Sequence, residues 1–157
     1  MATRVALPPP VERDTQCLAP KMSIAAQAAV IECNGQGWDA ILYETCRSAE
    51  LQQYYFDHGA SKAQTIEHSW HGYGLAVDVV SRQHGWDLWG RSIPTAWETN
   101  VTRIFLSHGL KWGGDWPTFH DYPHYQWGPC KRSPSDIAVT LLRTSGRAAV
   151  WRAVGAD

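Results

Sequence analysis

The sequence predicts a single α+β domain in which a small antiparallel sheet is flanked by helices. With 157 residues, the chain is long enough for one domain with its own apolar core. Segments whose apolar residues recur at helical spacing alternate with short apolar or aromatic runs that are typical of strands. Because the strands can neighbour one another through hairpins, we expect an antiparallel sheet. The sequence shows no internal repeat and no second domain.

The first predicted helix runs over residues 20–32. Its apolar stripe is expected at Ile24, Ala28 and Ile31, and Gly35 suits the left-handed backbone that ends many helices. Residues 38–45 are rich in aromatic and branched side chains. This composition predicts the first strand.

A second helix is expected to begin after the capping residue Ser48 and to end at Gly59. Arg47 therefore lies at the junction of a strand and a helix. The apolar run of residues 75–80 predicts a buried strand, and this strand carries one carboxylate, Asp78.

The second half of the chain predicts four further elements. A strongly periodic segment starts at Pro94 and stops at Gly109, which predicts a helix. Residues 110–116 and 123–128 are expected to form a short strand, a glycine-rich turn and a further strand. Residues 134–154 are expected to form two short helices that are split at Gly146.

We expect three parts along the chain. Residues 1–19, with three successive prolines, form an extended lead-in that is either strapped over the surface or loose. Residues 20–130 form the core that carries the candidate functional residues. Residues 131–157 form a helical extension that packs on this core.

The composition excludes two classes of partner. The net charge is -1, from 14 Lys and Arg against 15 Asp and Glu, so there is no basic surface for nucleic acid or for acidic lipid. No apolar run approaches the ~20 residues that span a bilayer, so membrane insertion is not expected. We expect a monomer.

The N-terminus and the cysteines bear on the cellular compartment. The first residues lack the long apolar stretch of a secretory signal, so synthesis in the cytoplasm without such a signal is expected. Two disulfides or four buried thiols are both compatible with the four widely spaced cysteines, and the thiol interpretation is favoured. These cysteines are Cys17, Cys33, Cys46 and Cys130.

A carboxylate in the middle of an apolar strand needs a compensating charge, because desolvating it alone is costly. Asp78 is such a residue, and His71 lies seven residues before it, after which Gly72 and Gly74 allow a tight backbone turn. A His and an Asp together suit a divalent transition metal, above all zinc. A structural ion pair between Asp78 and Arg47 is the alternative.

The segment from His120 to His124 superficially resembles the HExxH motif of helical zinc proteases. Pro123 would break the required helix, so this interpretation fails. At the entry to a strand, however, His124 can supply a third ligand, and Asp121 can lie beside the metal as a base. Alternatively, Asp121 only caps the turn before Pro123. His68 and His120 are rival ligands that we place in solvent or outside the ligand set.

Four ordered motifs resemble the zinc D-Ala-D-Ala carboxypeptidase and L-alanyl-D-glutamate endopeptidase family of peptidoglycan peptidases. They are SxHxxGxAxD at residues 69–78, DxPH at 121–124, the Arg47-Ser48 element with Gln52, and WGGDW at 112–116. The WGGDW motif and the Asp at position 121 are similar to the endopeptidase branch. The fold implied is that of the DD-peptidases and Hedgehog domains.

The resemblance implies a role for each motif residue. One zinc ion is held by His71, Asp78 and His124, leaving an open position for water. Asp121 is the catalytic base, and Arg47 contacts the substrate and its developing oxyanion. Substrate contacts or support of the ligands are expected from the remaining residues, which are Ser69, Gln52, Tyr73, Asp115 and Trp116.

The expected function is therefore zinc-dependent cleavage of peptidoglycan stem peptides, at the bond between L-Ala and D-Glu. By analogy, the protein is a phage endolysin that stays in the host cytoplasm until it is released onto the cell wall. Two alternatives stay open: a D,D-carboxypeptidase that releases terminal D-Ala, and a zinc-bearing cell-wall binding module without turnover. The disulfide state and the preferred wall chemotype stay open as well.

Overall fold

The computed structural model describes residues 7–85 and 92–157, and these residues form one α+β domain. The first six residues of the expected lead-in lie outside the described residues. A four-stranded antiparallel sheet has the strand order β1-β2-β4-β3. The strands are β1 (Ala40–Glu44), β2 (Ala76–Ser81), β3 (Leu110–Trp112) and β4 (His124–Trp127).

The described residues also form five α-helices and four short 3-10 helices. The α-helices are α1 (Pro20–Gly35), α2 (Ala49–Asp57), α3 (Thr95–Ser107), α4 (Asp136–Ser145) and α5 (Arg147–Ala153). The 3-10 helices are η1 (Thr15–Cys17), η2 (Ile66–His68), η3 (Trp70–Tyr73) and η4 (Gly113–Asp115). The predicted α+β class and each predicted helix and strand are confirmed.

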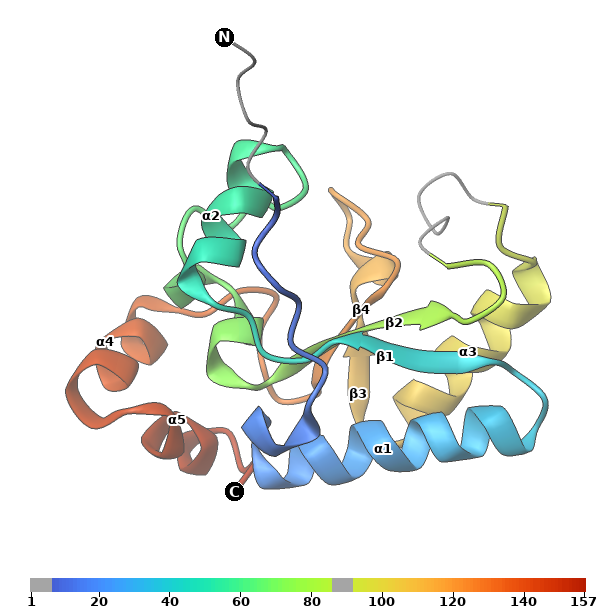
Figure 1. Cartoon of the computed structure of the whole chain (residues 1–157). Coiled ribbons are helices and arrows are strands. Elements are labelled where there is room, and N and C mark those ends of the chain that lie inside the picture. The colour runs from blue at the N-terminus through green and yellow to red at the C-terminus, as the bar shows by residue number, and fades with distance from the viewer. Residues whose placement is uncertain (1–6, 86–91) are drawn as a thin grey trace, which may run out of the picture.

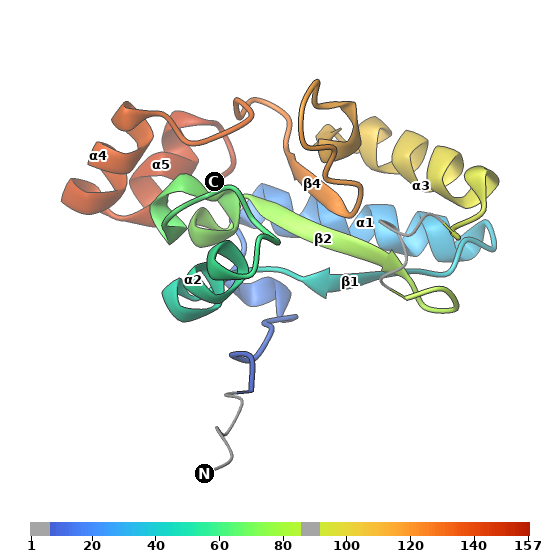
Figure 2. The same cartoon turned by 90° about the horizontal axis from the view of Figure 1, so that it is seen from above.

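The helices lie on two sides of the sheet. Helices α1 and α3 contact each other, and α1 lies below the strands in Figure 1, whereas α2 lies above them. Helices α4 and α5 pair at one end of the domain, away from α3, as Figure 2 also shows. The space above the sheet, between α2 and the loops of the second half, holds the candidate site. No helix among residues 7–85 and 92–157 is both long and apolar enough to cross a bilayer.

The predicted stripe of α1 was wrong, although the helix itself was predicted correctly. Ile24 and Ile31 are 69% and 72% exposed. The buried face consists of small or flexible side chains, which let the helix approach the sheet and α3 closely. These side chains are Met22, Ala25, Ala26, Ala29 and Cys33. Side-chain size, and not hydrophobicity alone, decided which face is buried.

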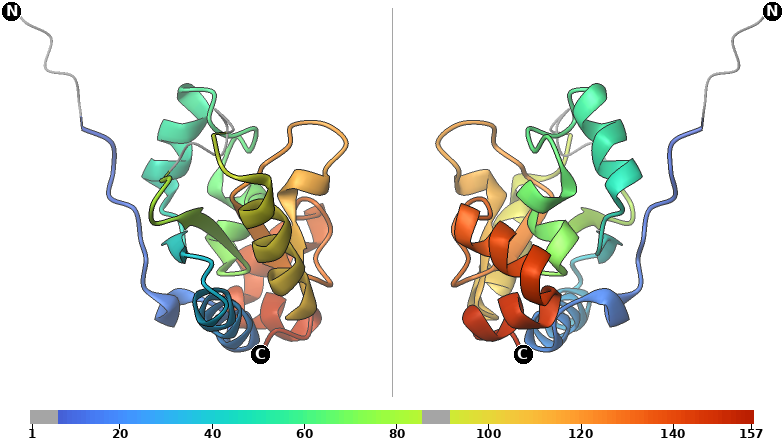
Figure 3. Two further views of the ribbon diagram at one scale, coloured as in Figure 1. Left: turned by 90° about the vertical axis from the view of Figure 1, so that its right-hand side faces the viewer. Right: turned by 90° about the vertical axis from the view of Figure 1, so that its left-hand side faces the viewer.

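The preference for four thiols was half wrong. Cys33 and Cys130 are free and buried, as expected, but Cys17 and Cys46 form a disulfide with a Cα–Cα distance of 6.1 Å. The extended segment before α1 runs outside β1, as Figure 3 shows. Cys17 at its end bonds to Cys46, which follows the last residue of β1 by two positions. Sequence spacing could not reveal the pairing because 29 residues separate the two cysteines.

Both ends of the described chain are attached to the core by hydrogen bonds. The backbone amide of Thr45 donates to the carbonyl of Glu12 at 2.9 Å. In α5, the indole of Trp151 donates to the carbonyl of Tyr73 at 2.6 Å. The indole of Trp127 donates to the carbonyl of Val154 at 2.9 Å. The segments that flank residues 20–130 therefore contact the loops that surround the candidate site.

Candidate functional site

Three acidic or imidazole side chains form a row across the sheet. Glu44 on β1 is paired in register with Asp78 on β2, and Asp78 is paired with His124 on β4. Side chains of directly opposed residues lie on the same face of a sheet. The strand register therefore places Asp78 between Glu44 and His124 on one face. All three side chains are buried.

The fourth member, His71, reaches this row from the 3-10 turn η3. Gly72 permits the turn, since a Cβ there would lie 2.5 Å from the carbonyl oxygen of Ile66. Gly74 ends the turn with a φ of 69°, in the left-handed region that favours glycine. The expectation that both glycines turn the imidazole toward the strand is confirmed.

His71, Asp78 and His124 bring three ligand atoms together. His71 Nε2 lies 3.2 Å from His124 Nδ1 and 3.3 Å from Asp78 Oδ1. His124 Nδ1 lies 3.6 Å from Asp78 Oδ1. Tetrahedral ligands at about 2.0–2.1 Å from a metal are separated by roughly 3.3–3.4 Å. The three separations therefore match three corners of a tetrahedron around one ion.

Hydrogen bonds on the far side of each ring fix which nitrogen faces the cluster. His71 Nδ1 lies 2.8 Å from the carbonyl oxygen of Thr45, which can only accept. His124 Nε2 lies 3.0 Å from Gln126 Oε1, and the Gln126 amide donates to the carbonyl of Lys131 at 2.7 Å. Each ring is thus protonated on its outer nitrogen. Two nitrogen lone pairs and a carboxylate oxygen converge, which only a cation stabilises.

The electrostatics of Asp78 and His124 agree with this assignment. Burial raises the pKa of Asp78, but His71, His124 and Arg47 outweigh burial and hold that pKa well below its usual range. Burial lowers the pKa of His124, but the neighbouring carboxylates of Asp78 and Asp121 raise it overall. The buried Asp78 Oδ1 has no hydrogen-bond partner. The residues therefore fit a divalent metal.

Three contacts hold Arg47 beside the three candidate metal ligands. Its Nε donates to Glu44 Oε1 at 2.5 Å, and its Nη1 donates to Gln52 Oε1 at 2.9 Å. Its guanidinium lies 4.8 Å from the centre of the Tyr55 ring. Burial lowers the pKa of Arg47, but Glu44 and Asp78 raise it overall. The alternative ion pair with Asp78 also exists, at 3.5 Å, so a bound metal would share this carboxylate with Arg47.

Asp121 lies at the opposite wall, where the glycine-rich turn supports it. Its backbone amide donates to the carbonyl of Gly113 at 3.1 Å. A Cβ on Gly113 would lie 2.6 Å from the Asp121 carbonyl oxygen, so the turn requires glycine. Burial raises the pKa of Asp121 to about 6, although His124 opposes the shift. A carboxyl with such a pKa can both accept and return a proton near neutral pH.

These residues line a cavity of about 350 Å³, a size that suits a ligand. Ser69 and Trp116 line it as expected, and the Trp116 ring centre lies 5.0 Å from that of His124. Arg132 lies over Trp116 at 5.0 Å, and Lys62 lies over Phe119 at 5.3 Å. We call Lys62, Trp116, Phe119 and Arg132 the rim of the cavity.

Two predicted supporting residues, Tyr73 and Asp115, have other places, whereas Gln52 supports Arg47 as expected. Tyr73 is buried in the core, where its hydroxyl donates to the carbonyl of Glu67 and its ring contacts Trp70. It lies two residues after His71 in a 3-10 helix, so its side chain points in another direction. Asp115 lies in a separate cavity beside α3. Gln52 is buried and holds Arg47 without lining the main cavity.

The rival histidines do not join the cluster of ligand atoms. His68 is exposed, with Nδ1 2.8 Å from Thr65 Oγ1. His120 is also exposed, and its Nδ1 lies 2.9 Å from the carbonyl oxygen of Gly114. Both histidines are therefore outside the ligand set, as expected.

Sequence reasoning missed the partners that orient the site. Gln126 follows His124 by two residues on the same strand, so alternation could have placed both side chains on one face. Glu44 ends the first strand next to the recognised arginine element, but its function was not deduced. The orienting group of Thr45 is its backbone carbonyl. Every residue has a backbone carbonyl, so the sequence could not identify this one.

Comparisons with known proteins agree with these motifs. A family model described as D-alanyl-D-alanine carboxypeptidase, of peptidase family M15, matches residues 62–127. The peptidoglycan L-alanyl-D-glutamate endopeptidase CwlK of Bacillus subtilis is 29% identical over 133 residues, which are 76% of this chain and 77% of that protein. The L-alanyl-D-glutamate peptidase of Listeria phage A118 is 34% identical over 113 residues. That alignment covers 69% of this chain but only 37% of the phage protein.

Two solved structures share the fold. The Serratia marcescens L-Ala D-Glu endopeptidase ChiX superposes with a TM-score of 0.57 at 23% identity, covering 72% of this chain and 82% of that chain. VanYB in complex with D-Alanine-D-Alanine superposes with a TM-score of 0.53 at 16% identity, covering 92% of this chain and 87% of that chain. At these sequence identities, the similarity to the two structures shows that the fold is shared.

Proposed function

Because the chain belongs to peptidase family M15, we propose that it is a zinc-dependent endopeptidase of peptidoglycan stem peptides that cleaves the bond between L-Ala and D-Glu. The observation that carries this proposal is the convergence of two histidine lone pairs and an unpartnered carboxylate oxygen at tetrahedral separations. When bound, zinc supplies Lewis-acid activation of water and of the scissile carbonyl.

The protein side chains have distinct tasks in this reaction. Asp121 accepts the proton of the attacking water and returns it to the leaving amine of D-Glu. Arg47 stays charged throughout and presents N–H donors to the carbonyl oxygen or to a carboxylate of the stem peptide. Glu44 and Gln52 restrict the guanidinium to one orientation, which lowers the entropy cost of substrate binding.

The choice of scissile bond is supported by the names of the two relatives, which are L-alanyl-D-glutamate peptidases. The Asp at position 121 and the WGGDW turn support the same choice. The matching family model is described as D-alanyl-D-alanine carboxypeptidase, so release of terminal D-Ala is the competing activity.

We further propose that the enzyme acts on the cell wall after leaving the cytoplasm in which it is made, as a phage endolysin does. One relative is a phage protein. The Cys17–Cys46 disulfide is typical of proteins that work outside a reducing cytoplasm. We propose that the active species is a monomer.

Mass spectrometry of purified peptidoglycan tests the proposed activity. The protein is incubated with the wall as purified, with a chelator, and with chelator followed by added zinc. We expect new D-Glu amino termini that disappear with the chelator and return with zinc. Released D-Ala would reassign the enzyme as a carboxypeptidase. Folded, zinc-loaded protein that gives no product on several wall chemotypes would identify a binding module instead.

A further inference from the structure

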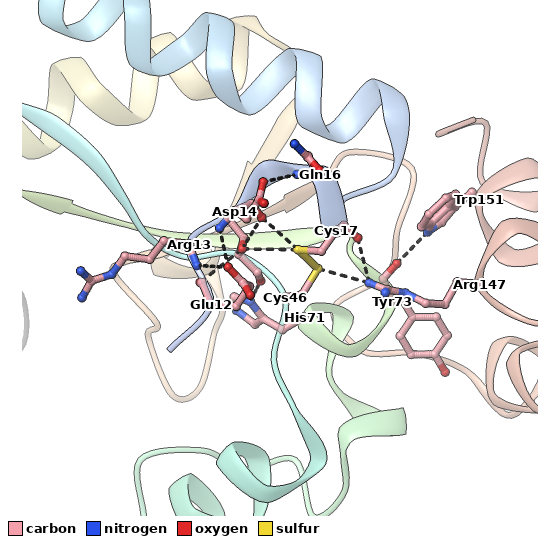
Figure 4. The surroundings of a disulfide bond; sticks show 11 residues. Glu12, Arg13, Asp14, Gln16, Cys17, Cys46, His71, Tyr73, Arg147 and Trp151 are labelled. Atoms are coloured by element: carbon pink, nitrogen blue, oxygen red, sulfur yellow. Dashed lines mark hydrogen bonds between the residues drawn. A yellow bond between two sulfur atoms is a disulfide. The ribbon is translucent and has the colours of Figure 1, made fainter. Parts of the chain in front are cut away.

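A disulfide lies directly beside the candidate site. Cys17 is the last residue of η1, and Cys46 lies between Thr45 and Arg47. Figure 4 shows the two sulfur atoms next to the N-terminal segment and close to His71. The covalent bond therefore joins the segment before α1 to the loop that connects β1 with the arginine of the site.

The same two segments are also joined by hydrogen bonds. The amide of Thr45 donates to the Glu12 carbonyl at 2.9 Å, and its hydroxyl donates to the Asp14 carbonyl at 2.8 Å. Arg13 Nε donates to the carbonyl of Tyr43 at 3.1 Å. Residues 12–14 are thus attached to the end of β1 by these backbone and side-chain hydrogen bonds. Thr45 is fully buried by these contacts.

Both neighbours of Cys46 contact the candidate ligand His71. The carbonyl of Thr45 accepts from His71 Nδ1 at 2.8 Å, and this bond selects the tautomer whose Nε2 faces Asp78 and His124 without a proton. The amide of Arg47 donates to the carbonyl of His71 at 3.2 Å. A shift of Cys46 would therefore move the orienting carbonyl and the arginine together.

The packing around the disulfide leaves little room for such a shift in the oxidised protein. Arg147 donates to the carbonyl of Cys17 at 3.0 Å and lies 3.2 Å from Cys46 Sγ. A Cβ on Gly74 would lie 2.6 Å from the Cys17 carbonyl oxygen. The disulfide is thus held where three segments meet, and one of them, at Gly74, follows His71 by three residues.

Without the disulfide, the attachment of the N-terminal segment would be weak. Glu12, Arg13 and Asp14 are exposed and the described residues before them form no helix or strand, so this segment opens more readily than the core. The disulfide keeps the segment near Thr45 by removing most of its conformational freedom.

We propose that the Cys17–Cys46 disulfide is a positioning element of the active site, which holds the Thr45 carbonyl against His71 and Arg47 beside Asp78, so that the oxidised enzyme binds zinc more tightly and turns over faster than the reduced enzyme. The turnover part rests on the proposed function, whereas the metal-binding part does not. Neither cysteine contacts the reacting atoms.

The other two cysteines do not take part in the oxidation and reduction of the Cys17–Cys46 pair. Burial raises the pKa of Cys33 to about 11 and that of Cys130 to about 12, so neither forms a reactive thiolate near neutral pH. A phosphine reductant reacts with the disulfide in one balanced step. The sulfur–sulfur bond breaks, the phosphine takes up the oxygen of one water as its oxide, and the two sulfur atoms become thiols.

The experiment compares four proteins: oxidised wild type, phosphine-reduced wild type, the double variant Cys17→Ser/Cys46→Ser, and Cys33→Ala as a matched control. A phosphine is used because dithiol reductants bind zinc themselves. Thiols are counted after denaturation, zinc affinity is measured by competition with a chelator, and kcat and KM are measured on a stem peptide. Thermal unfolding of the metal-free proteins defines a temperature at which all four are folded.

We expect two thiols in the oxidised protein and four after reduction. Reduced wild type and the double variant should bind zinc about 10–100-fold more weakly than oxidised wild type, in the range found for lost partners of metal ligands. Their kcat should fall together with this affinity. The double variant should not respond to the phosphine, and Cys33→Ala should respond as wild type does.

Two results would overturn the proposal. One is a reduced protein with four thiols whose zinc affinity and kcat/KM stay within twofold of the oxidised form. The other is a protein that contains four thiols even after treatment with an oxidant. If the double variant does not fold, the proposal is tested by the zinc affinity and kcat/KM of reduced wild type, measured below its unfolding temperature. If no form cleaves peptidoglycan, the proposed function fails, and the zinc affinities still test the disulfide.

Discussion

The floor and the rim of the cavity are built in different ways. The floor, which consists of Glu44, Asp78, His124 and His71, is buried, and three of its members are fixed by strand register. The rim, defined above, lies on loops and is held by contacts between cations and aromatic rings. Floor positions change only if the sheet changes, whereas rim positions depend on a few side chains.

This difference teaches which region determines the chemistry and which determines the choice of substrate. A metal site requires ligand atoms within tenths of an ångström, and a sheet provides this accuracy. Recognition of a flexible peptide tolerates more adjustment. The single non-glycine residue with positive φ among the described residues, Phe119 at 52°, belongs to the rim. Backbone strain of this kind is common at ligand-binding positions.

The largest expected effect comes from the floor. His71→Ala, Asp78→Ala and His124→Ala should each lose nearly all bound zinc, because two remaining ligands do not hold the ion. Activity should fall to that of the chelated wild type. Metal content by atomic emission and circular dichroism of the same samples check this. Full zinc content in any of the three folded variants would contradict the ligand assignment.

Asp121→Ala should come next, since it removes the proton acceptor and leaves the ligands in place. We expect kcat to fall about 100- to 10,000-fold with zinc content unchanged. Wild-type kcat/KM should decrease as the pH falls through the pKa of Asp121, because the protonated carboxyl accepts no proton. Burial raises that pKa to about 6 in the metal-free protein, and bound zinc should lower it. A pH profile without this acidic limb would exclude Asp121 as the base.

Gln126→Leu tests whether the floor depends on partners beyond the ligands. The variant removes the acceptor of His124 Nε2, so the imidazole can rotate and change tautomer. We expect zinc affinity to drop about 10–100-fold while the sheet stays folded. Gln27→Leu on the exposed side of α1 is the matched control and should bind zinc as wild type does. Equal affinities in the two variants would show that the ligands alone fix the site.

The smallest effect is expected at the rim. Arg132→Ala loses the contact with Trp116 and two hydrogen bonds to Thr118. KM for a stem peptide should rise about 2- to 5-fold, as for an exposed cation–π contact, with kcat and zinc affinity unchanged. Steady-state kinetics beside a zinc titration separates the two parameters. A loss of zinc in this variant would mean that rim and floor are not independent.

The sequence alone determined the elements and the candidate metal ligands. The cap at Ser48 and the spacing of apolar residues in most elements are local signals, and local signals survive without knowledge of the fold. The left-handed end of α1 expected at Gly35 was wrong, since Gly35 is still part of the helix and the left-handed backbone lies at Gly37. His71, Asp78 and His124 belong to short ordered motifs, so their function was predicted from residue type and spacing. The structure brings these three side chains together.

The tertiary structure decided everything that depends on two distant segments meeting. The buried face of α1, the Cys17–Cys46 pair and the places of Tyr73 and Asp115 were predicted wrongly or left open, because each depends on which surface a side chain meets. The orienting roles of the Thr45 carbonyl and of Gln126 arise from the same cause. Residue type and spacing define which atoms can bind a metal, but only strand register and packing decide which hydrogen bonds hold those atoms in place.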